Sequence, residues 1–169
     1  MEVTPEAARG FATGCEAASG FEYHMPHQLL NAFPIVIEFD VGWSDMDSFD
    51  HVSNLEYLRY FQDARLNYIL RTGWLDTKRD HGLGPILKST SATYRKPLKF
   101  PDHVWVGVRA AELLGDRVTF EHKLVSRTWD AVACEGTAVV VSYDYRNECK
   151  VAIPERVRNV IEELEGHTK

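Results

Sequence analysis

The chain has 169 residues, enough for one domain with a sizeable core, and its contents of 44% hydrophobic and 26% charged residues are ordinary for a globular protein. A formal net charge of −6 without a basic face argues against a general nucleic-acid-binding protein, and the apolar runs are far too short to span a bilayer. Three widely spaced cysteines without a CxxC pair predict neither a disulfide framework nor a zinc site, and they are typical of a reducing compartment.

Residues 1–33 are rich in Ala, Gly and Glu and show weak periodicity, so we expect a partly ordered N-terminal extension. They lack the basic start and continuous apolar run of a secretory signal, and the cytoplasm is therefore the expected location. The character of the sequence changes from Phe33 onward. PIVIEFDVGW is β-branched and aromatic, which predicts a first strand over residues 35–43 and a folded domain over residues 34–169.

A long helix is indicated most clearly, in the segment NLEYLRYFQDARLNYILRTGW. Hydrophobic side chains recur every three or four residues from Leu55 to Ile69. This spacing predicts a helix with a broad buried face, on which Leu55 and Ile69 both lie. Ser53 or Asn54 can cap the first turn, and Gly73 supplies the stop.

Four segments with a period of two follow a connecting stretch that contains Gly82, Gly84 and Pro85. The predicted strands cover residues 86–96, 103–114, 117–127 and 131–145, and a short helix over residues 154–165 closes the domain. Consecutive strands with short turns imply a mostly antiparallel sheet, so the predicted class is α+β. One long helix packed across such a curved sheet is the hot-dog architecture, whose open edges favour pairing with a second subunit.

The acidic loop SDMDSFDHVSN directly precedes the long helix. Counted from Asp45, acids fall at positions 1, 3 and 12, as in a calcium-binding loop. Positions 5 and 6 do not fit, because Phe49 offers no oxygen ligand and Asp50 stands where the sharp turn requires glycine. A transition-metal site built on Asp47 and His51 would need further ligands, and the other histidines form no ligand-spaced pair, so no metal is expected.

Two interpretations of this loop remain open on local physics. Acids are common in strand-to-helix turns and are stabilised by the helix dipole, typically by about 0.3–1 kcal/mol, but this does not account for His51. Alternatively, a carboxylate beside exposed helix N–H groups can act as a general base on water or as a nucleophile. The N–H groups would then stabilise the oxyanion that forms from an ester or thioester.

The run W-S-D-M-D-S-F-D-H-V-S-N, followed by L-E-Y-L-R-Y-F-Q-D-A-R, resembles the 4-hydroxybenzoyl-CoA thioesterase-like family of hot-dog acyl-CoA thioesterases. It is most similar to the branch that acts on fatty acyl-CoA, whose signature is W-x-D-x-D-x-x-x-H-V-N-N with a following Y-L-x-F/Y-x-E/D-A-R. The resemblance is densest in this motif and extends by strand order over residues 34–165. It implies an acyl-CoA substrate, hydrolysis to free acid and CoA in lipid metabolism, no cofactor, and a homodimer or a homotetramer.

The resemblance also assigns catalytic roles. The second aspartate of the D-x-D pair is the family's catalytic carboxylate and corresponds to Asp47. The family's oxyanion donor is a backbone N–H at the start of the central helix, at or near Asn54, and His51 is expected to support the loop or to orient water. The sequence departs from the branch at Ser53, usually Asn, and at Asp50, more often Gly, Gln or Met.

Substrate contacts follow from the same resemblance. In hot-dog thioesterases, basic residues near strand ends and helix starts meet CoA phosphates, often across the dimer interface. Arg95, Lys96 and Lys99 precede a strand and are candidates for this role, although a solvated turn is an equal alternative. Tyr57, in the first turn of the helix, is expected to contact substrate.

Two further residues are expected to be structural. Arg65, within the D-A-R segment, should pair with Asp63, with Glu56 or with an acid of a partner subunit. His122 lies on the apolar face of its strand and is expected to be a core histidine with its hydrogen bonds satisfied.

Two other functions remain open. A hydratase of this fold also uses Asp and His, but with a spacing of five and an intervening Asn-Pro, whereas Asp47 and His51 are four apart without a proline. A non-catalytic protein that binds acyl-CoA or an acyl carrier would bind its ligand without releasing a thiol. The sequence fixes neither acyl chain length nor a preference for aromatic acyl groups.

Overall fold

The computed structural model describes residues 27–166, so most of the predicted N-terminal extension, residues 1–26, lies outside the described residues. The elements in chain order are η1 (Gln28–Leu30), β1 (Ile35–Asp40), η2 (Trp43–Asp45), α1 (Asn54–Arg71), α2 (Trp74–His81), β2 (Leu83–Tyr94), β3 (His103–Leu113), β4 (Arg117–Ser126), β5 (Ala131–Asp144), β6 (Cys149–Lys150) and α3 (Glu155–Leu164).

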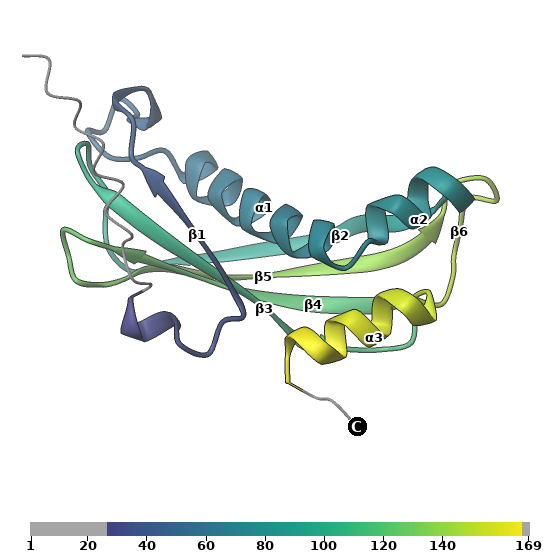
Figure 1. Ribbon diagram of the computed structural model, residues 1–169. Coiled ribbons are helices and arrows are strands. Elements are labelled where there is room, and N and C mark those ends of the chain that lie inside the picture. The colour runs from purple at the N-terminus through teal and green to yellow at the C-terminus, as the bar shows by residue number, and fades with distance from the viewer. Residues whose placement is uncertain (1–26, 167–169) are drawn as a thin grey trace, which may run out of the picture.

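The strands form one antiparallel sheet that curves along α1 (Figure 1). Five strands follow the order β1-β3-β4-β5-β2, and the short β6 pairs with β5. β2 is an edge strand whose only strand partner in the described chain is β5. The predicted α+β class, with a curved antiparallel sheet around one long helix, is confirmed.

The bounds of the elements differ from the predictions in four places. The first strand ends at Asp40, earlier than predicted, because the chain turns into η2, where the Gly42 N–H donates to the Asp45 carboxylate over 2.9 Å. The stretch predicted as a connection contains α2, which is bounded by Gly73 and Gly82 in left-handed conformations. β2 begins at Leu83, earlier than predicted, so Gly84 and Pro85 belong to the strand and not to the connection. The fourth difference is β6, which is too short to produce a recognisable pattern.

The helix α1 is capped as predicted, since the Ser53 Oγ accepts a hydrogen bond from the Leu55 N–H. Its buried side chains meet the sheet and are Tyr57, Tyr60, Phe61, Ala64, Arg65, Tyr68 and Ile69. The prediction that Leu55 is buried is wrong, because the first turn of α1 faces solvent and this side chain is 66% exposed. The residue after α3 is tied to α1, because the Tyr68 hydroxyl donates to Glu165 over 2.7 Å, and Val157 and Ile161 of α3 belong to the same hydrophobic core.

The segment 27–33 packs on the outer face of the sheet, on the side away from α1 (Figure 1). Leu30 is buried there against Trp105 of β3. Gly107 makes this approach possible, because a Cβ at that position would lie 2.7 Å from Cγ of Phe33. The last part of the predicted extension therefore packs directly against the domain.

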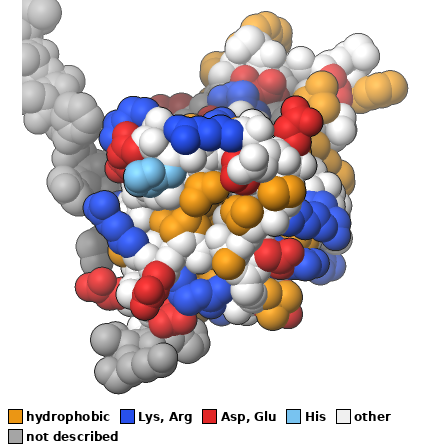
Figure 2. All heavy atoms as spheres, turned by 90° about the vertical axis from the view of Figure 1, so that its right-hand side faces the viewer, with side chains coloured by type: hydrophobic (Ala, Val, Ile, Leu, Met, Phe, Trp, Pro, Cys, Tyr) orange, Lys and Arg blue, Asp and Glu red, His pale blue; other side chains and the backbone are white. Residues whose placement is uncertain are grey.

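Several hydrophobic side chains of residues 27–166 are exposed on the surface. Figure 2 shows a hydrophobic patch bordered by charged side chains at the end of the molecule that carries α2 and β6. Elsewhere, Leu66 and Leu70 of α1 and Ile86 and Leu87 of β2 are exposed. No helix within residues 27–166 has the length and hydropathy needed to cross a membrane.

Candidate active site

The acidic loop folds into a closed turn between η2 and α1. Met46 and Val52 form an isolated antiparallel bridge, and inside it the Asp47 N–H donates to the His51 carbonyl over 2.8 Å. Asp50 occupies the left-handed region with φ of +61°. Aspartate is one of the few residues other than glycine that adopt this conformation readily, because its short polar side chain can be accommodated there.

Asp45 has a structural role in this turn. Its Oδ2 accepts hydrogen bonds from the Gly42 N–H over 2.9 Å and from the Tyr60 hydroxyl over 2.7 Å, and Arg59 lies 3.6 Å from Oδ1. The carboxylate therefore fastens η2 to the first half of α1 and has little capacity left for chemistry.

Asp47 is exposed and has a different environment. Its Oδ1 accepts a hydrogen bond from the Phe49 N–H over 2.8 Å, which holds the side chain in place. Its Oδ2 has no hydrogen-bond partner within residues 27–166 and is available to a water molecule or a substrate.

An open pocket of about 520 Å³ lies at the N-terminus of α1. Three of its lining residues are the predicted catalytic ones, Asp47, His51 and Asn54. The remaining lining residues are Phe49, Val52, Tyr57, Tyr94, Arg95, Lys96 and Pro97. The structure thus brings together all the predicted site residues except Lys99.

The first turn of α1 supplies hydrogen-bond donors to this pocket. Helix geometry leaves the first N–H groups without intrahelical acceptors, and Ser53 Oγ satisfies the one of Leu55. The Asn54 N–H has no acceptor in the described part of the chain. A donor at a helix N-terminus next to a carboxylate can stabilise the oxyanion of a tetrahedral intermediate while the carboxylate activates water.

Tyr57 forms one wall of the pocket, but its hydroxyl is already engaged. It donates to the Lys96 carbonyl over 3.3 Å and accepts from the Leu98 N–H over 3.0 Å. Burial raises the pKa of Tyr57 to about 12, so the hydroxyl stays protonated at neutral pH. The predicted substrate contact is therefore limited to the aromatic ring, and the hydroxyl fixes the chain that enters β3.

The three cations predicted to meet CoA phosphates have different surroundings. Arg95 pairs with Glu135 over 2.9 Å. Lys99 pairs with Asp50 over 2.6 Å, and this contact lowers the pKa of the Asp50 carboxyl. Lys96 lies 5.2 Å from the ring centroid of Trp129 and has no carboxylate partner within residues 27–166, which makes it the most available of the three cations.

The aromatic rim of the pocket was not predicted. Phe49 is 80% exposed in the acidic loop, and Tyr94 is half-exposed at the end of β2 with its ring against that of Tyr57. An aromatic residue at the tip of a polar loop is the sequence signal that could have identified Phe49, since such a side chain has no role in turn formation.

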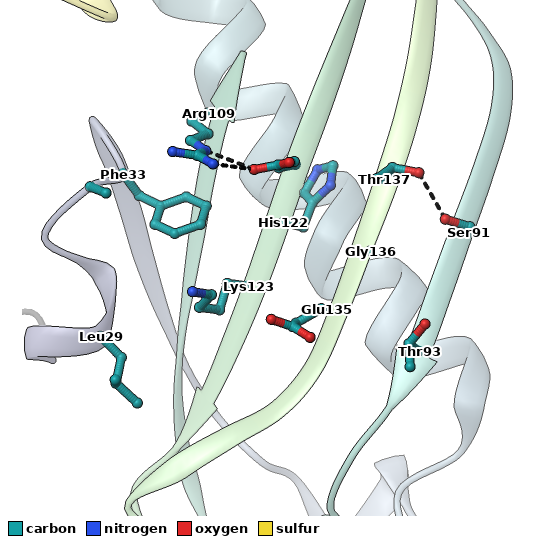
Figure 3. Close-up of a pocket in the computed structure, with 12 residues that line it drawn as sticks. Leu29, Phe33, Ser91, Thr93, Arg109, His122, Lys123, Glu135, Gly136 and Thr137 are labelled. Atoms are coloured by element: carbon teal, nitrogen blue, oxygen red, sulfur yellow. Dashed lines mark hydrogen bonds and ion pairs between the residues drawn. The ribbon is translucent and has the colours of Figure 1, made fainter. Parts of the chain in front are cut away.

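A second hollow lies on the convex face of the sheet (Figure 3). Its polar groups are largely paired with one another: Arg109 with Glu121 over 2.6 Å, and Ser91 with Thr137 over 2.8 Å. His122 forms part of its floor, although its ring is stacked on Phe61 of α1. The pocket at the α1 N-terminus is therefore the candidate active site. Within residues 27–166 no group of three or more potential metal ligands is present.

The curved antiparallel sheet around one helix, with a carboxylate pocket at the helix N-terminus, defines a hot-dog protein of the thioesterase type. The chain belongs to the thioesterase-like superfamily, whose family model matches residues 41–161.

Individual relatives agree with this assignment. A protein of Aquifex aeolicus (strain VF5), described provisionally as an esterase, is 29% identical over 131 residues, which are 77% of this chain and 99% of the relative. A thioesterase of Thermus thermophilus, solved with coenzyme A and Zn, is 27% identical with a TM-score of 0.72 and covers 82% of this chain and 99% of its own. A Staphylococcus aureus protein solved with CoA superposes with a TM-score of 0.74 over 80% of this chain and 85% of its own, and at 15% identity it supports the fold alone.

Proposed function

We propose that this protein hydrolyses acyl-CoA thioesters to a free carboxylic acid and CoA. The observation that carries the proposal is the pocket in which Asp47, His51 and the Asn54 N–H meet at the start of α1. The similarity to a thioesterase solved with coenzyme A supports CoA as the thiol part of the substrate, and the acidic-loop motif supports a fatty acyl group.

Asp47 carries the chemical step in this proposal. Its free oxygen takes a proton from water as water attacks the thioester carbonyl, or it attacks the carbonyl itself as a nucleophile. The Asn54 N–H donates to the oxyanion that develops, and the carbon–sulfur bond then breaks, so that CoA leaves as a thiolate and takes the proton held by Asp47. In the nucleophilic route, water hydrolyses the acyl–Asp47 anhydride, and the proton that this water releases neutralises the thiolate. His51 lines the same pocket and orients water beside the carboxylate.

Lys96 and the aromatic rim receive the CoA part of the substrate. Lys96 has no carboxylate partner within the described residues, so its charge is available to a phosphate group. Arg95 and Lys99 contribute only after their ion pairs with Glu135 and Asp50 open.

A homodimer or a dimer of dimers is proposed as the assembly. The edge strand β2 presents unpaired backbone groups together with Ile86 and Leu87, and α1 exposes Leu66 and Leu70. A second copy paired along β2 would cover these groups, because antiparallel pairing of two edges satisfies both.

The Asp47→Asn variant tests the chemical step. We expect kcat for acyl-CoA hydrolysis to fall by about 10²–10⁴, because a well-placed general base contributes that factor. The measurement is thiol release from a panel of acyl-CoAs of different length and aromaticity. Asp76→Asn on α2, an exposed change of the same type, is the matched control and should leave kcat unchanged.

Full activity of Asp47→Asn would rule out this assignment. The same assay separates the alternatives, since a binding protein releases no thiol. A hydratase would consume the double bond of an enoyl-CoA without releasing CoA.

A further inference from the structure

Two buried polar residues of the core, Arg65 and His122, do not extend the candidate active site. Arg65 lines neither of the two hollows described above, and Arg59 is the cation that approaches Glu56 and Asp63, over 2.5 Å and 3.9 Å. The prediction that Arg65 pairs with either acid is therefore wrong. His122 is buried, as predicted, and belongs to the hollow on the opposite face of the sheet.

Trp129 lies beside one wall of the candidate active site, in the turn between β4 and β5. This turn is at the same end of the molecule as the start of α1 (Figure 1). Trp129 is 46% exposed, and its indole Nε1 donates to the Pro97 carbonyl over 2.8 Å. The Lys96 ammonium lies 5.2 Å from the ring centroid. Because Lys96 and Pro97 both line the pocket that contains Asp47, the indole adjoins that pocket through these two residues.

Hydrogen bonds hold the turn that carries Trp129. The Asp102 carboxylate accepts from the Ser126 hydroxyl over 2.6 Å, and from the N–H and hydroxyl of Thr128 over 3.0 Å and 2.9 Å. The Ser126 Oγ in turn accepts from the Trp129 N–H over 3.1 Å. An exposed aromatic ring that is already held in place loses little conformational freedom when a ligand binds to it.

A similar aromatic residue, Tyr145, lies at the other end of β5. It is also exposed, its hydroxyl donates to the Pro85 carbonyl over 2.9 Å, and Lys78 lies 4.2 Å from its ring centroid. Neither Lys78 nor Pro85 lines the pocket at the α1 N-terminus. An exposed ring beside a lysine therefore adjoins the candidate active site at Trp129 and not at Tyr145.

The groups at Trp129 match the chemistry of a nucleotide. An exposed indole ring stacks on a purine base, and a lysine without a carboxylate partner in the described chain attracts a phosphate. CoA carries an adenine base and a 3′-phosphate at the end remote from its thiol, and a flexible pantetheine arm joins the two ends. A substrate with its thioester at Asp47 can thus place its nucleotide at Lys96 and Trp129, because Asp47 and Lys96 line one pocket.

We propose that the Trp129 ring stacks on the adenine of CoA while Lys96 binds the 3′-phosphate. The inference rests on the proposed thioesterase function and deepens it, because it names the part of the substrate that is recognised apart from the acyl group. CoA thioesters are then preferred to thioesters that share the pantetheine arm and lack the nucleotide, such as those of an acyl carrier protein. Trp129 determines this specificity and takes no part in the chemical step.

The Trp129→Leu variant of the full-length protein tests the stacking contact. Thiol release is measured with two substrates that share one acyl group, an acyl-CoA and the corresponding acyl-pantetheine. We expect KM for the acyl-CoA to rise about five- to hundredfold with kcat unchanged, the factor that one base–aromatic stack supplies. KM for the acyl-pantetheine should not change. Tyr145→Leu is the matched control and should leave both KM values unchanged.

The Lys96→Gln variant tests the phosphate contact. The wild-type protein should hydrolyse an acyl-CoA with a kcat/KM about two- to fivefold higher than that for the acyl-dephospho-CoA, which lacks the 3′-phosphate, since an exposed ion pair supplies that factor. The variant should lose this difference. A wild-type protein that does not distinguish the two substrates would overturn the role of Lys96.

Two outcomes with Trp129→Leu would overturn the stacking contact. One is an unchanged KM for the acyl-CoA. The other is an equal loss on acyl-CoA and acyl-pantetheine, which would show that the indole only supports the wall at Pro97. Trp129→Phe keeps an aromatic ring without the Nε1–H and should retain most of the preference for CoA. If Trp129→Leu does not fold, equal KM values of the wild-type protein for the two substrates would contradict the proposal.

A binding measurement separates this inference from the proposed function. If no thioester is hydrolysed, the proposed function fails, and calorimetry with adenosine 3′,5′-bisphosphate decides the nucleotide site. We expect this probe to bind the wild-type protein more tightly than it binds Trp129→Leu. Absence of binding, or equal binding to both proteins, would overturn the inference.

Discussion

Three aspartates of one short loop have the same chemistry and three different environments. Asp45 is engaged by Gly42 and Tyr60, and Asp50 holds a left-handed backbone and pairs with Lys99. Asp47 is exposed, forms no ion pair within residues 27–166, and lines the pocket at the α1 N-terminus with one oxygen left free. The neighbouring groups therefore give the three carboxylates different environments. Their spacing along the chain alone does not predict these differences.

His122 makes a pH-dependent contribution at the residue scale. Its pKa is about 3 in the folded protein and about 6.5 in the unfolded chain, so the unfolded state binds more protons between these values. The free energy of unfolding therefore falls as the pH falls through this window, by about 2–3 kcal/mol between pH 7 and about pH 4.5. Urea unfolding of wild type and His122→Phe over this range measures the difference.

The Phe variant should show a shallower loss of stability in acid, because the group that titrates on unfolding is absent. His51→Phe is the control, since His51 is not deeply buried and its removal should leave the acid limb in place. Identical slopes for wild type and His122→Phe would show that other groups dominate acid unfolding.

The motif predicted which residues gather at the N-terminus of α1, because Asp47, His51 and Asn54 are local in sequence and one turn of chain positions them together. The cations were less predictable. Lys99 pairs with Asp50 across 49 residues, and Arg95 pairs with Glu135 across 40. Such pairs depend on how the strands assemble, which local patterns do not encode.

At the scale of elements, α1 meets β5 through a fit between Phe61 and Gly136. A Cβ at position 136 would collide with the Ser91 carbonyl oxygen and come within 2.7 Å of Phe61 Cε2. Gly136→Ala should therefore destabilise the fold by about 1–3 kcal/mol, the range for overpacking. Gly115→Ala is the matched control, because a Cβ there meets nothing within 4 Å.

Thermal or urea unfolding of both glycine variants checks the prediction. Equal midpoints would mean that Phe61 moves aside without cost. The same fit places the Phe61 ring against His122, with a centroid distance of 4.9 Å.

The elements that were predicted well have a continuous pattern over ten residues or more. α1 and strands β3, β4 and β5 have this property, and their bounds agree closely with those expected. The eight-residue α2 depends on Trp74, which is fully buried, and on packing against β2. The helix α2 is stabilised by tertiary packing, so no local sequence pattern predicted it.

At the scale of the whole molecule, the open edge at β2 should determine assembly. We expect the chain of 19.3 kDa to sediment as a dimer or a larger even oligomer. Leu87→Glu on β2 should shift the mass toward the monomer, because charge on an edge strand opposes edge-to-edge pairing. Leu114→Glu, at an exposed position between β3 and β4, should not.

Analytical ultracentrifugation over a range of concentrations measures this shift. A wild-type protein that is monomeric throughout would refute pairing along β2. An equal effect of both substitutions would indicate a general loss of solubility.

The hydroxyl of Tyr57 holds the segment before β3 through the carbonyl of Lys96 and the N–H of Leu98, and the Leu98 carbonyl in turn accepts from the Val52 N–H over 2.9 Å. All three contacts on this segment use backbone atoms of residues 96 and 98, so they do not depend on the side chains there, although proline at position 98 would lack the N–H. Side chains at positions 96 and 97 can therefore diverge during evolution while the wall of the pocket keeps its distance from the acidic loop. Substitution at these two positions should therefore change the lining of the pocket without moving this segment relative to Asp47.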